Sequence, residues 1–301
     1  MTTQNIQYTQ CPCCGSFRIS RSLTAKDFTV SGEEFEIWEC GDCTLRFTQN
    51  VPNAASIWPY YQSAAYVSHS DTREGLINRL YHFVREYTLK SKIKLVCAAT
   101  QLRKGKLLDV GAGTGAFANA MSKAGWEVTG LEPDETARKN AEAKYTLVLQ
   151  SSETLYSLDE EQFDAITMWH VLEHVHDLQG YLEKFHGVLK QNGKLIIAVP
   201  NYTSYDAKLY HDSWAAYDVP RHLYHFSPHS METLAAFKGF TVKDFRPMWF
   251  DSFYVCMLSE KYKYGRGNMM AAFLNGLVSN IKAMRNNKKC SSVIYVLEKN
   301  S

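Results

Sequence analysis

The segment KLLDVGAGTG, residues 106–115, decides how the chain is interpreted. Residues 106–110 form a short and largely apolar run, which is typical of a strand buried in a parallel sheet. Gly111, Gly113 and Gly115 follow directly, and glycines let a ligand approach the backbone closely. The free N–H groups at the start of a following helix can bind an anion. We therefore expect a strand, a ligand-binding loop and a helix in this order.

Strand and helix patterns alternate on the C-terminal side of this loop. Strands are expected at 127–131, 163–168, 194–199, 241–245 and 292–297, and helices at 117–124, 135–144, 178–189 and 230–238. Strands that alternate with helices of this length predict an α/β fold. We expect a Rossmann-like, doubly wound and mostly parallel sheet with helices on both faces.

Two cofactors fit the glycine loop. The spacing Gly111-x-Gly113-x-x-Ala116 is that of a dinucleotide fingerprint, whereas Asp109 followed by Gly111, Gly113 and Gly115 is the methyltransferase form. Glu132 ends the next strand and can accept hydrogen bonds from ribose hydroxyls in either case. These residues favour S-adenosylmethionine over a nicotinamide cofactor, and both remain open at this point.

Four of the eight cysteines form two C-x-x-C pairs, Cys11 with Cys14 and Cys40 with Cys43. Each pair can wrap one edge of a tetrahedral zinc ion, which predicts a small zinc ribbon ahead of the sheet. Cys13 is left over and is interpreted as a bystander. We expect a zinc ribbon over residues 1–50, a helical connector or lid over 51–100, and the Rossmann-like domain over 101–301 with a helical insertion at about 252–289.

Composition narrows the classes of function. The chain has 301 residues with 33 Lys and Arg against 31 Asp and Glu, a net charge of +2, whereas nucleic-acid binders are usually far more basic. No apolar run is long enough to span a membrane, and residues 1–10 lack the apolar region of a secretory signal. A cytoplasmic protein is therefore expected, in which clustered cysteines indicate a metal rather than disulfides.

Three further motifs lie outside the glycine loop. They are WHVLEHV at 169–175, LKQNGKLIIAVPN at 189–201 and DVPRHLYHFSP at 218–228. Together with the loop they resemble class I S-adenosylmethionine-dependent methyltransferases, in the subgroup of ubiquinone-biosynthesis-like and bacterial small-molecule enzymes, over about residues 58–298. The zinc ribbon lies outside that core and is similar to N-terminal modules of some sugar and RNA methyltransferases.

The resemblance implies a role for each matching residue. Asp109 and the three loop glycines would frame the methionine moiety, and Glu132 would bind the ribose. The remaining residues assigned to the cofactor are Pro133, Ser152 near the adenine, and Met168, Trp169 and His170 on the methyl-donor side.

The acceptor side is expected in residues 201–229, an aperiodic and aromatic-rich run, with the tyrosines of 60–66 closing part of the cleft. Histidine suits proton transfer near neutral pH, and His222 is preferred as the base because it follows the last parallel strand. Arg221 is expected to bind a carboxylate or phosphate of the acceptor, and His170 is a further catalytic candidate. His174 and His225 are weaker candidates.

The run His170-x-x-Glu173-His174 has a second interpretation. On a helix these positions share one face, where two imidazoles and a carboxylate can hold a divalent metal. Cofactor lining or packing is the alternative that we favour.

Residues 259–289 are basic and carry an apolar stripe at helical spacing. Such a helix can lie on an anionic membrane surface, which makes a peripheral membrane contact one interpretation. A helical cap or a dimer contact is the other, and the sequence does not predict the oligomeric state.

The sequence predicts S-adenosylmethionine-dependent methyl transfer to a small-molecule acceptor, such as a sugar, a lipid or a quinone-type intermediate. An RNA methyltransferase is the alternative, although the low net charge and the acidic second half of the ribbon make nucleic acid an unfavourable partner. A non-catalytic zinc-ribbon binding module is a third possibility, against which the intact set of Asp109, glycine loop and Glu132 argues.

Overall fold

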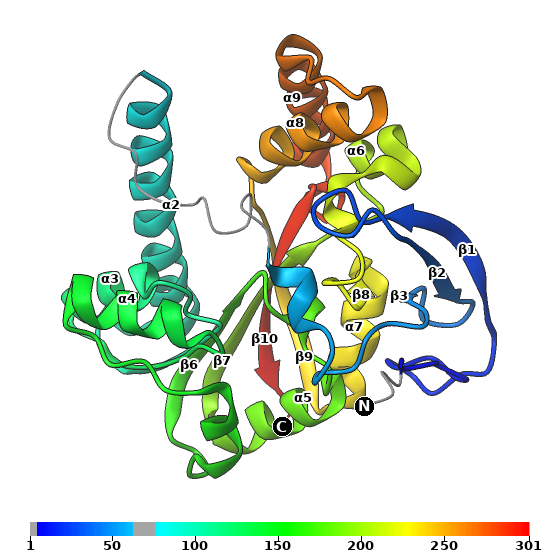
Figure 1. Cartoon of the computed structure of the whole chain (residues 1–301). Coiled ribbons are helices and arrows are strands. Elements are labelled where there is room, and N and C mark those ends of the chain that lie inside the picture. Colours follow the sequence, from blue (N-terminus) through cyan, green and yellow to red (C-terminus); the bar gives the residue numbers. More distant parts are fainter. Residues whose placement is uncertain (1–4, 63–75, 301) are drawn as a thin grey trace.

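A six-stranded sheet forms the centre of the protein. The computed structural model describes residues 5–62 and 76–300 (Figure 1). The strands are β4 (Lys106–Val110), β5 (Glu127–Leu131), β6 (Phe163–Trp169), β7 (Leu189–Pro200), β9 (Phe240–Pro247) and β10 (Ser292–Lys299). Their order is β5-β4-β6-β7-β10-β9, with β10 antiparallel to both of its neighbours and the other pairs parallel. The predicted Rossmann-like, mostly parallel α/β fold is confirmed.

Strand order reverses at β4, which has β5 on one side and β6 on the other. The crossovers leave β4 in opposite directions, an arrangement that in open α/β sheets forms a crevice at the carboxyl ends of the strands. Ligands of open α/β sheets bind at such a switch point. The predicted glycine loop follows β4 directly and therefore lies in this crevice.

Helices cover both faces of the sheet. They are α2 (Leu76–Thr100), α3 (Ala116–Lys123), α4 (Glu135–Tyr145), α5 (Leu178–Val188) and α7 (Pro228–Phe237). Side chains of β7 alternate between two cores: Ile196 packs with Phe117 of α3, and Ile197 packs in the core that contains Phe185 of α5. Successive side chains of a strand point to opposite faces of the sheet, so a strand buried on both faces contributes alternately to the two cores.

Residues 11–48, here called the cysteine module, form an antiparallel sheet from β1 (Ile19–Lys26), β2 (Glu34–Cys40) and β3 (Arg46–Thr48). Its fourth strand is β8 (Tyr224–His225), which pairs with β3 and comes from the far end of the chain. Cys11, Cys40 and Cys43 belong to the same buried cluster as the side chains on one face of the central sheet. The module is therefore anchored to the central domain by backbone pairing and by a shared core.

Short helices occupy the run expected to be aperiodic: α6 (Tyr205–Tyr210), η4 (His211–Ser213) and η5 (Ala215–Tyr217). In the described part of the chain, the structure has four further 3₁₀ turns: η1 (Trp58–Tyr61), η2 (Ser152–Ser157), η3 (Leu172–His174) and η6 (Asn287–Lys289). Elements of three to six residues are too short to show a period in the sequence.

A helical pair is inserted between β9 and β10, namely α8 (Asp251–Tyr264) and α9 (Met269–Arg285). Gly265, with a φ of +72°, ends α8 in the left-handed conformation that favours glycine. Figure 1 shows this pair projecting from the upper end of β10 beside α6. Among the described residues, no helix has both the length and the apolar character needed to cross a membrane.

Candidate active site

The glycine loop folds as the sequence predicts, and Gly111 and Gly113 serve different purposes. Gly111 has a φ of +71°, and a Cβ added to it would lie 2.3 Å from Cγ2 of Val171. This glycine therefore lets the segment after β6 pack directly against the loop. Gly113 has a φ of +55°, and a Cβ there would meet no described atom within 4 Å. Open space above Gly113 is what a ligand lying against the backbone requires.

The acid after β5 is hydrogen-bonded to the backbone of the glycine loop. Glu132 accepts a hydrogen bond from the backbone N–H of Gly113 at 2.7 Å and another from that of Asp134 at 3.0 Å. Burial raises the pKa of the Glu132 carboxyl, and these two donors oppose the shift. The carboxylate is thus held beside the loop, at the end of the neighbouring strand.

Asp109 lies beneath the loop rather than on its surface. Its side chain is buried and accepts a hydrogen bond from the Thr167 hydroxyl at 2.8 Å. Burial raises its pKa to about 7, and Thr167 and Lys92 oppose the shift. Asp109 therefore joins β4 to β6 under the crevice, which is compatible with a role in framing the loop.

The predicted residues of the methyl-donor side do not share one environment. Met168 is fully buried in the core on one face of the sheet, whereas Trp169 packs in the core on the other face. Consecutive residues of a strand point to opposite faces, so these two side chains cannot line the same surface. The Lys92 ammonium of α2 lies 4.2 Å from the Trp169 ring centre, and burial lowers the pKa of Lys92 to about 8.

Two observations are compatible with a polar, hydroxyl-bearing cofactor at this loop. Gly113 leaves open space that a Cβ would occupy, and Glu132 presents a carboxylate beside it. Gln150 pairs with Leu131 beside β5, which brings Ser152 at the start of η2 to the same edge of the sheet. Pro133 follows Glu132 at this edge.

His170 lies between two carboxylates. Its Nε2 is 2.8 Å from Oδ2 of Asp251 on α8, and its Nδ1 is 3.3 Å from Oε1 of Glu173. Burial by itself lowers the pKa of His170, but the two acids raise it to about 10. His170 is therefore an imidazolium near neutral pH, and it has no free lone pair with which to accept a proton.

Residues 170–174 do not form the helix on which the predicted metal face depended. His170 has a φ of +57°, and helical structure is confined to the short η3 turn. The expectation that His170, Glu173 and His174 share one helical face is wrong. The structure instead brings together ligand atoms of Glu173, His174 and His222, which lie within 4.8 Å of one another.

The residues Glu173, His174 and His222 are here called the trio, and the His174 and His222 rings lie edge to face with centres 4.6 Å apart. Nδ1 of His174 donates to the Arg221 carbonyl at 3.0 Å, and Nδ1 of His222 donates to the Ala216 carbonyl at 2.9 Å. A ring nitrogen that donates to a carbonyl carries the proton, so Nε2 of each histidine keeps its lone pair. Oε2 of Glu173 is buried without a partner among the described residues. The trio can therefore accept a proton or hold a cation.

Arg221 lies differently from the expectation. Its guanidinium is fully buried and donates to Asp27, Asp218 and the carbonyl of Tyr60. An acceptor anion has no access to a group enclosed in this way, so the expected acceptor contact is not present. Arg221 instead ties the cysteine module to the segment that carries His222.

The remaining acceptor-side residues divide between site and core. The Tyr61 hydroxyl lies 3.1 Å from Nδ1 of His174, which places this tyrosine beside the trio, whereas Tyr66 lies outside the described residues. His225 is buried against the Thr48 hydroxyl, and burial holds its pKa well below the usual range. The aromatic side chains Tyr202, Tyr210, Trp214, Tyr217, Tyr224 and Phe226 are buried in the core.

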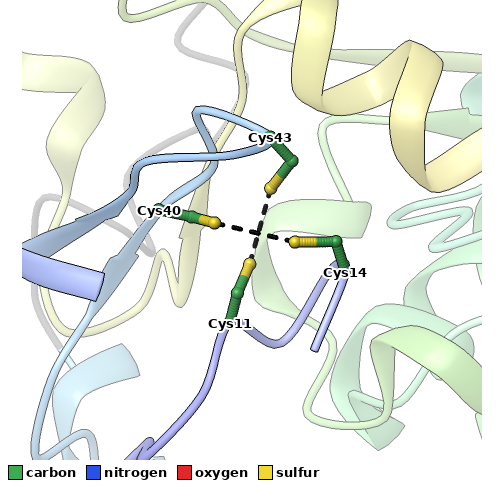
Figure 2. A group of neighbouring side chains, drawn as sticks. All are labelled: Cys11, Cys14, Cys40 and Cys43. Carbon is green, nitrogen blue, oxygen red and sulfur yellow. Dashed lines mark hydrogen bonds between the residues drawn. The ribbon is translucent and has the colours of Figure 1, made fainter. Parts of the chain in front are cut away.

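The four predicted cysteine ligands converge on one point (Figure 2). Sγ of Cys11 is 3.5 Å from that of Cys43, and Sγ of Cys14 is 3.6 Å from that of Cys40. A zinc tetrahedron with bonds of about 2.3 Å has edges of about 3.8 Å, which these separations approach. Backbone N–H groups of Cys13 and Asp42 donate to two of the sulfur atoms, as thiolate ligands require.

Two functional contacts had no signal in the sequence. Asp251 reaches His170 from a helix 81 residues away, and Lys92 reaches Trp169 from a helix that precedes the glycine loop. Both depend on how helices pack on the finished sheet. A pattern of spacing within one segment cannot report them.

Comparisons with known proteins agree with this geometry. The family described as "Methyltransferase domain" matches residues 81–244, more than half of the chain. The chain is similar to the ubiquinone biosynthesis O-methyltransferase of Actinobacillus pleuropneumoniae, with 36% identity over 109 residues, 33% of this chain and 47% of that protein. The mitochondrial ubiquinone biosynthesis O-methyltransferase of Homo sapiens is 29% identical over 164 residues, 49% of this chain and 44% of that protein. The chain thus spans about half the length of the curated relatives it matches.

A solved structure from Galdieria sulphuraria, named as a candidate sarcosine dimethylglycine methyltransferase, shares the fold. It is 16% identical with a TM-score of 0.50, and the match covers 74% of this chain and 88% of that one. Fold, switch-point crevice and glycine loop define the class of Rossmann-like methyltransferase domains. The chain belongs to the methyltransferase domain family.

Proposed function

We propose that the protein transfers a methyl group from S-adenosylmethionine to a small-molecule acceptor. The observation that carries this proposal is the contact between Gly111 and Val171. Val171 lies just before Glu173 and His174 of the trio, so this contact sets the proton-accepting groups directly beside the glycine loop. A cofactor crevice and a group that can deprotonate an acceptor thereby share one end of the sheet.

Different residues of the crevice bind different parts of the cofactor. When bound, S-adenosylmethionine supplies a methyl group on a positively charged sulfur atom. Gly113 leaves open space in which the cofactor can lie against the backbone, Gly111 and Gly115 let Val171 and Ala141 pack against the loop, and Glu132 accepts hydrogen bonds from the cofactor's hydroxyl groups. Asp109 keeps the loop in register with β6 through Thr167.

His222 is the proposed proton acceptor. The Ala216 carbonyl fixes its tautomer, so that Nε2 takes the proton of an acceptor hydroxyl as the oxygen gains its methyl group. The carboxylate of Glu173 lies within the trio, close to the imidazole that receives the proton. His170, already protonated, orients Glu173 and acts as a positioning residue rather than as a base.

An oxygen atom of a small molecule is the acceptor that the relatives support best, because the matching curated proteins are named as O-methyltransferases. A nucleic-acid acceptor is less well supported. The cysteine module exposes both acidic side chains, Glu33 and Glu34, and basic ones, Arg21 and Lys26, so it lacks the basic surface that a phosphate backbone requires.

The cysteine module is proposed to hold one zinc ion through Cys11, Cys14, Cys40 and Cys43. Each pair closes a tight loop, and the sulfur atoms are nearly tetrahedral in spacing. Because the module shares its sheet with β8, the ion supports the segment that places His222.

The test is transfer of a radiolabelled methyl group from S-adenosylmethionine to defined acceptors. The panel contains hydroxylated aromatics, sugars, lipid extract and transcribed RNA. Label in a small-molecule fraction, with release of S-adenosylhomocysteine, supports the proposal. Label in RNA alone would assign the chain to the alternative class, and binding of the cofactor without transfer to any fraction would favour a non-catalytic module.

A further inference from the structure

Helix α9 has its apolar residues on the outside. Its buried positions are small or polar: Ala272, Gly276, Ser279, Asn280 and Ala283. Its large apolar side chains are exposed by 40–73%, namely Met270, Phe273, Leu274, Leu277, Ile281 and Met284. A surface helix of a globular protein ordinarily has the reverse arrangement.

Specific contacts fix this orientation. The Ser279 hydroxyl donates to Asp206 at 2.7 Å, and the Asn280 amide donates to the Trp249 carbonyl at 2.8 Å. A Cβ on Gly276 would lie 2.8 Å from the Phe253 ring, so only glycine allows α8 and α9 to pack this closely. Rotating α9 to bury its apolar face would break both hydrogen bonds and drive larger side chains against α8. The outward stripe is therefore built into the fold.

The insertion that carries the stripe is basic. Residues 261–289 contain no Asp or Glu, and the exposed cations in this range are Lys261, Lys263, Arg266, Lys282, Arg285 and Lys289. Glu260, just before the range, is buried and accepts a hydrogen bond from the Tyr210 hydroxyl. Arg285 lies one helical turn after Ile281 and so borders the apolar face. Arg285 thus places a cation at the edge of the apolar face, in an insertion whose residues 261–289 carry no acid to oppose it.

We infer that α9 docks on an anionic lipid bilayer, with its apolar stripe in the interface and its cations on the headgroups. A helix with an apolar stripe and flanking lysines and arginines is suited to that position. Each cation near an anionic surface adds about fivefold to the binding constant. A second copy of this face is disfavoured, because two such surfaces would bring like charges together without an acidic residue between them. The inference rests on this surface and is independent of the proposed function.

Vesicle sedimentation with the full chain tests the inference. The protein should sediment with vesicles of phosphatidylcholine mixed with phosphatidylglycerol, and should stay in solution with vesicles of phosphatidylcholine alone. Added salt should weaken the sedimentation, because it screens exposed charges. Equal binding to both vesicles, or none to either, would overturn the inference.

Two variants separate the apolar and the charged contributions. Leu277→Ser with Ile281→Ser should weaken binding to the mixed vesicles more than about tenfold, since each removes an exposed aliphatic group that the bilayer would bury. Arg285→Gln with Lys289→Gln should weaken it about twentyfold or more by charge alone. Val148→Ser removes an exposed apolar side chain elsewhere and should bind as the unaltered chain does.

Circular dichroism and zinc content establish that each variant is folded. All four positions are exposed, so both double variants should fold. If the serine variant does not fold, the glutamine variant alone tests the inference. Undiminished binding by the folded variants would overturn the inference. So would a dimer of the unaltered chain, seen by sedimentation velocity, that the serine pair dissociates, because a second copy would then be the occupant.

Discussion

The guanidinium of Arg221 lies 2.9 Å from the carboxylate of Asp27, and both side chains are fully buried. Asp27 follows β1 in the cysteine module, and Arg221 precedes β8 in the segment that carries His222. Asp27 also accepts hydrogen bonds from the backbone of Thr29 and Ser31. The pair therefore connects the turn after β1 to the acceptor side of the crevice.

Removing Arg221 should be strongly destabilising. Arg221→Leu leaves the Asp27 carboxylate buried without its cation, which should lower the free energy of unfolding by about 3–5 kcal/mol. Urea unfolding followed by fluorescence measures the change. Arg18→Ala breaks an exposed ion pair with Asp42 and should cost at most about 1 kcal/mol. A similar decrease in the free energy of unfolding in both variants would show that the buried ion pair stabilises the protein no more than the exposed one.

Zinc content checks the cysteine cluster. Purified protein should contain about one zinc ion per chain, and Cys40→Ser with Cys43→Ser should lose it. The same variant should unfold more readily, because these residues belong to the core that covers the central sheet. Cys97→Ser, in α2, and Cys13→Ser are the matched controls and should keep the metal. Full zinc in the double variant would exclude these ligands.

His222→Ala should separate binding from turnover. We expect the affinity for S-adenosylhomocysteine to stay nearly constant, while turnover on a responsive acceptor falls by about 10²–10⁴ because the proton acceptor is lost. His229→Ala replaces an exposed histidine of the same segment and should leave turnover unchanged. Unaltered turnover in His222→Ala would remove this residue from the mechanism.

The trio also offers a test for a bound cation. Dialysis against a chelator, followed by return of zinc, manganese or magnesium, separates metal-assisted from metal-free deprotonation. If turnover stays constant after dialysis and the cysteine cluster keeps its zinc, Nε2 of His222 acts without a metal. Recovery that depends on an added ion would assign the trio as its ligands.

The pair of His170 and Asp251 should make stability depend on pH. Burial alone would lower the pKa of His170, but Asp251 and Glu173 raise it to about 10. A raised pKa stabilises the fold fully below the unfolded value of about 6.5, and this contribution is lost as the pH rises through the folded value. Asp251→Asn should therefore destabilise the protein most at about pH 6, with the difference shrinking toward about pH 10.

Urea unfolding of both proteins across this range measures the difference. Asp244→Asn removes an acid that pairs with exposed Arg246 and should give a small difference at every pH. An Asp251→Asn effect that stays constant from about pH 6 to about pH 10 would contradict the assigned imidazolium.

Strands and helices of the central domain could be predicted because burial on both faces of a sheet leaves continuous apolar runs. The strand expected at 194–199 begins earlier in the structure, at Leu189. The sequence does not predict this start because the polar residues Lys190, Gln191 and Asn192 resemble a loop. The spacing of residues 170–174 predicts a shared helical face. The left-handed backbone of His170 interrupts that period, and residue spacing does not report it, although histidine adopts this conformation more often than most residues.

Some residues of the candidate site could be predicted from the sequence and others could not. The glycine loop and Glu132 could be found because they lie within one strand-loop-helix-strand unit, where spacing reports geometry. The buried position of Arg221 could not be found, since its partner Asp27 lies 194 residues away in the cysteine module. Pairing across that distance depends on how β8 joins β3, which no local pattern encodes.

Calorimetric titration of S-adenosylhomocysteine measures whether the glycine loop and Glu132 bind the product of the cofactor. The unaltered chain should bind it, and Glu132→Ala should bind about ten- to hundredfold more weakly, because hydrogen bonds to a charged carboxylate are lost. Glu127→Ala removes an exposed acid from the same strand and should bind as the unaltered chain does. Equal affinity in Glu132→Ala, or binding of NADH without binding of S-adenosylhomocysteine, would contradict the account.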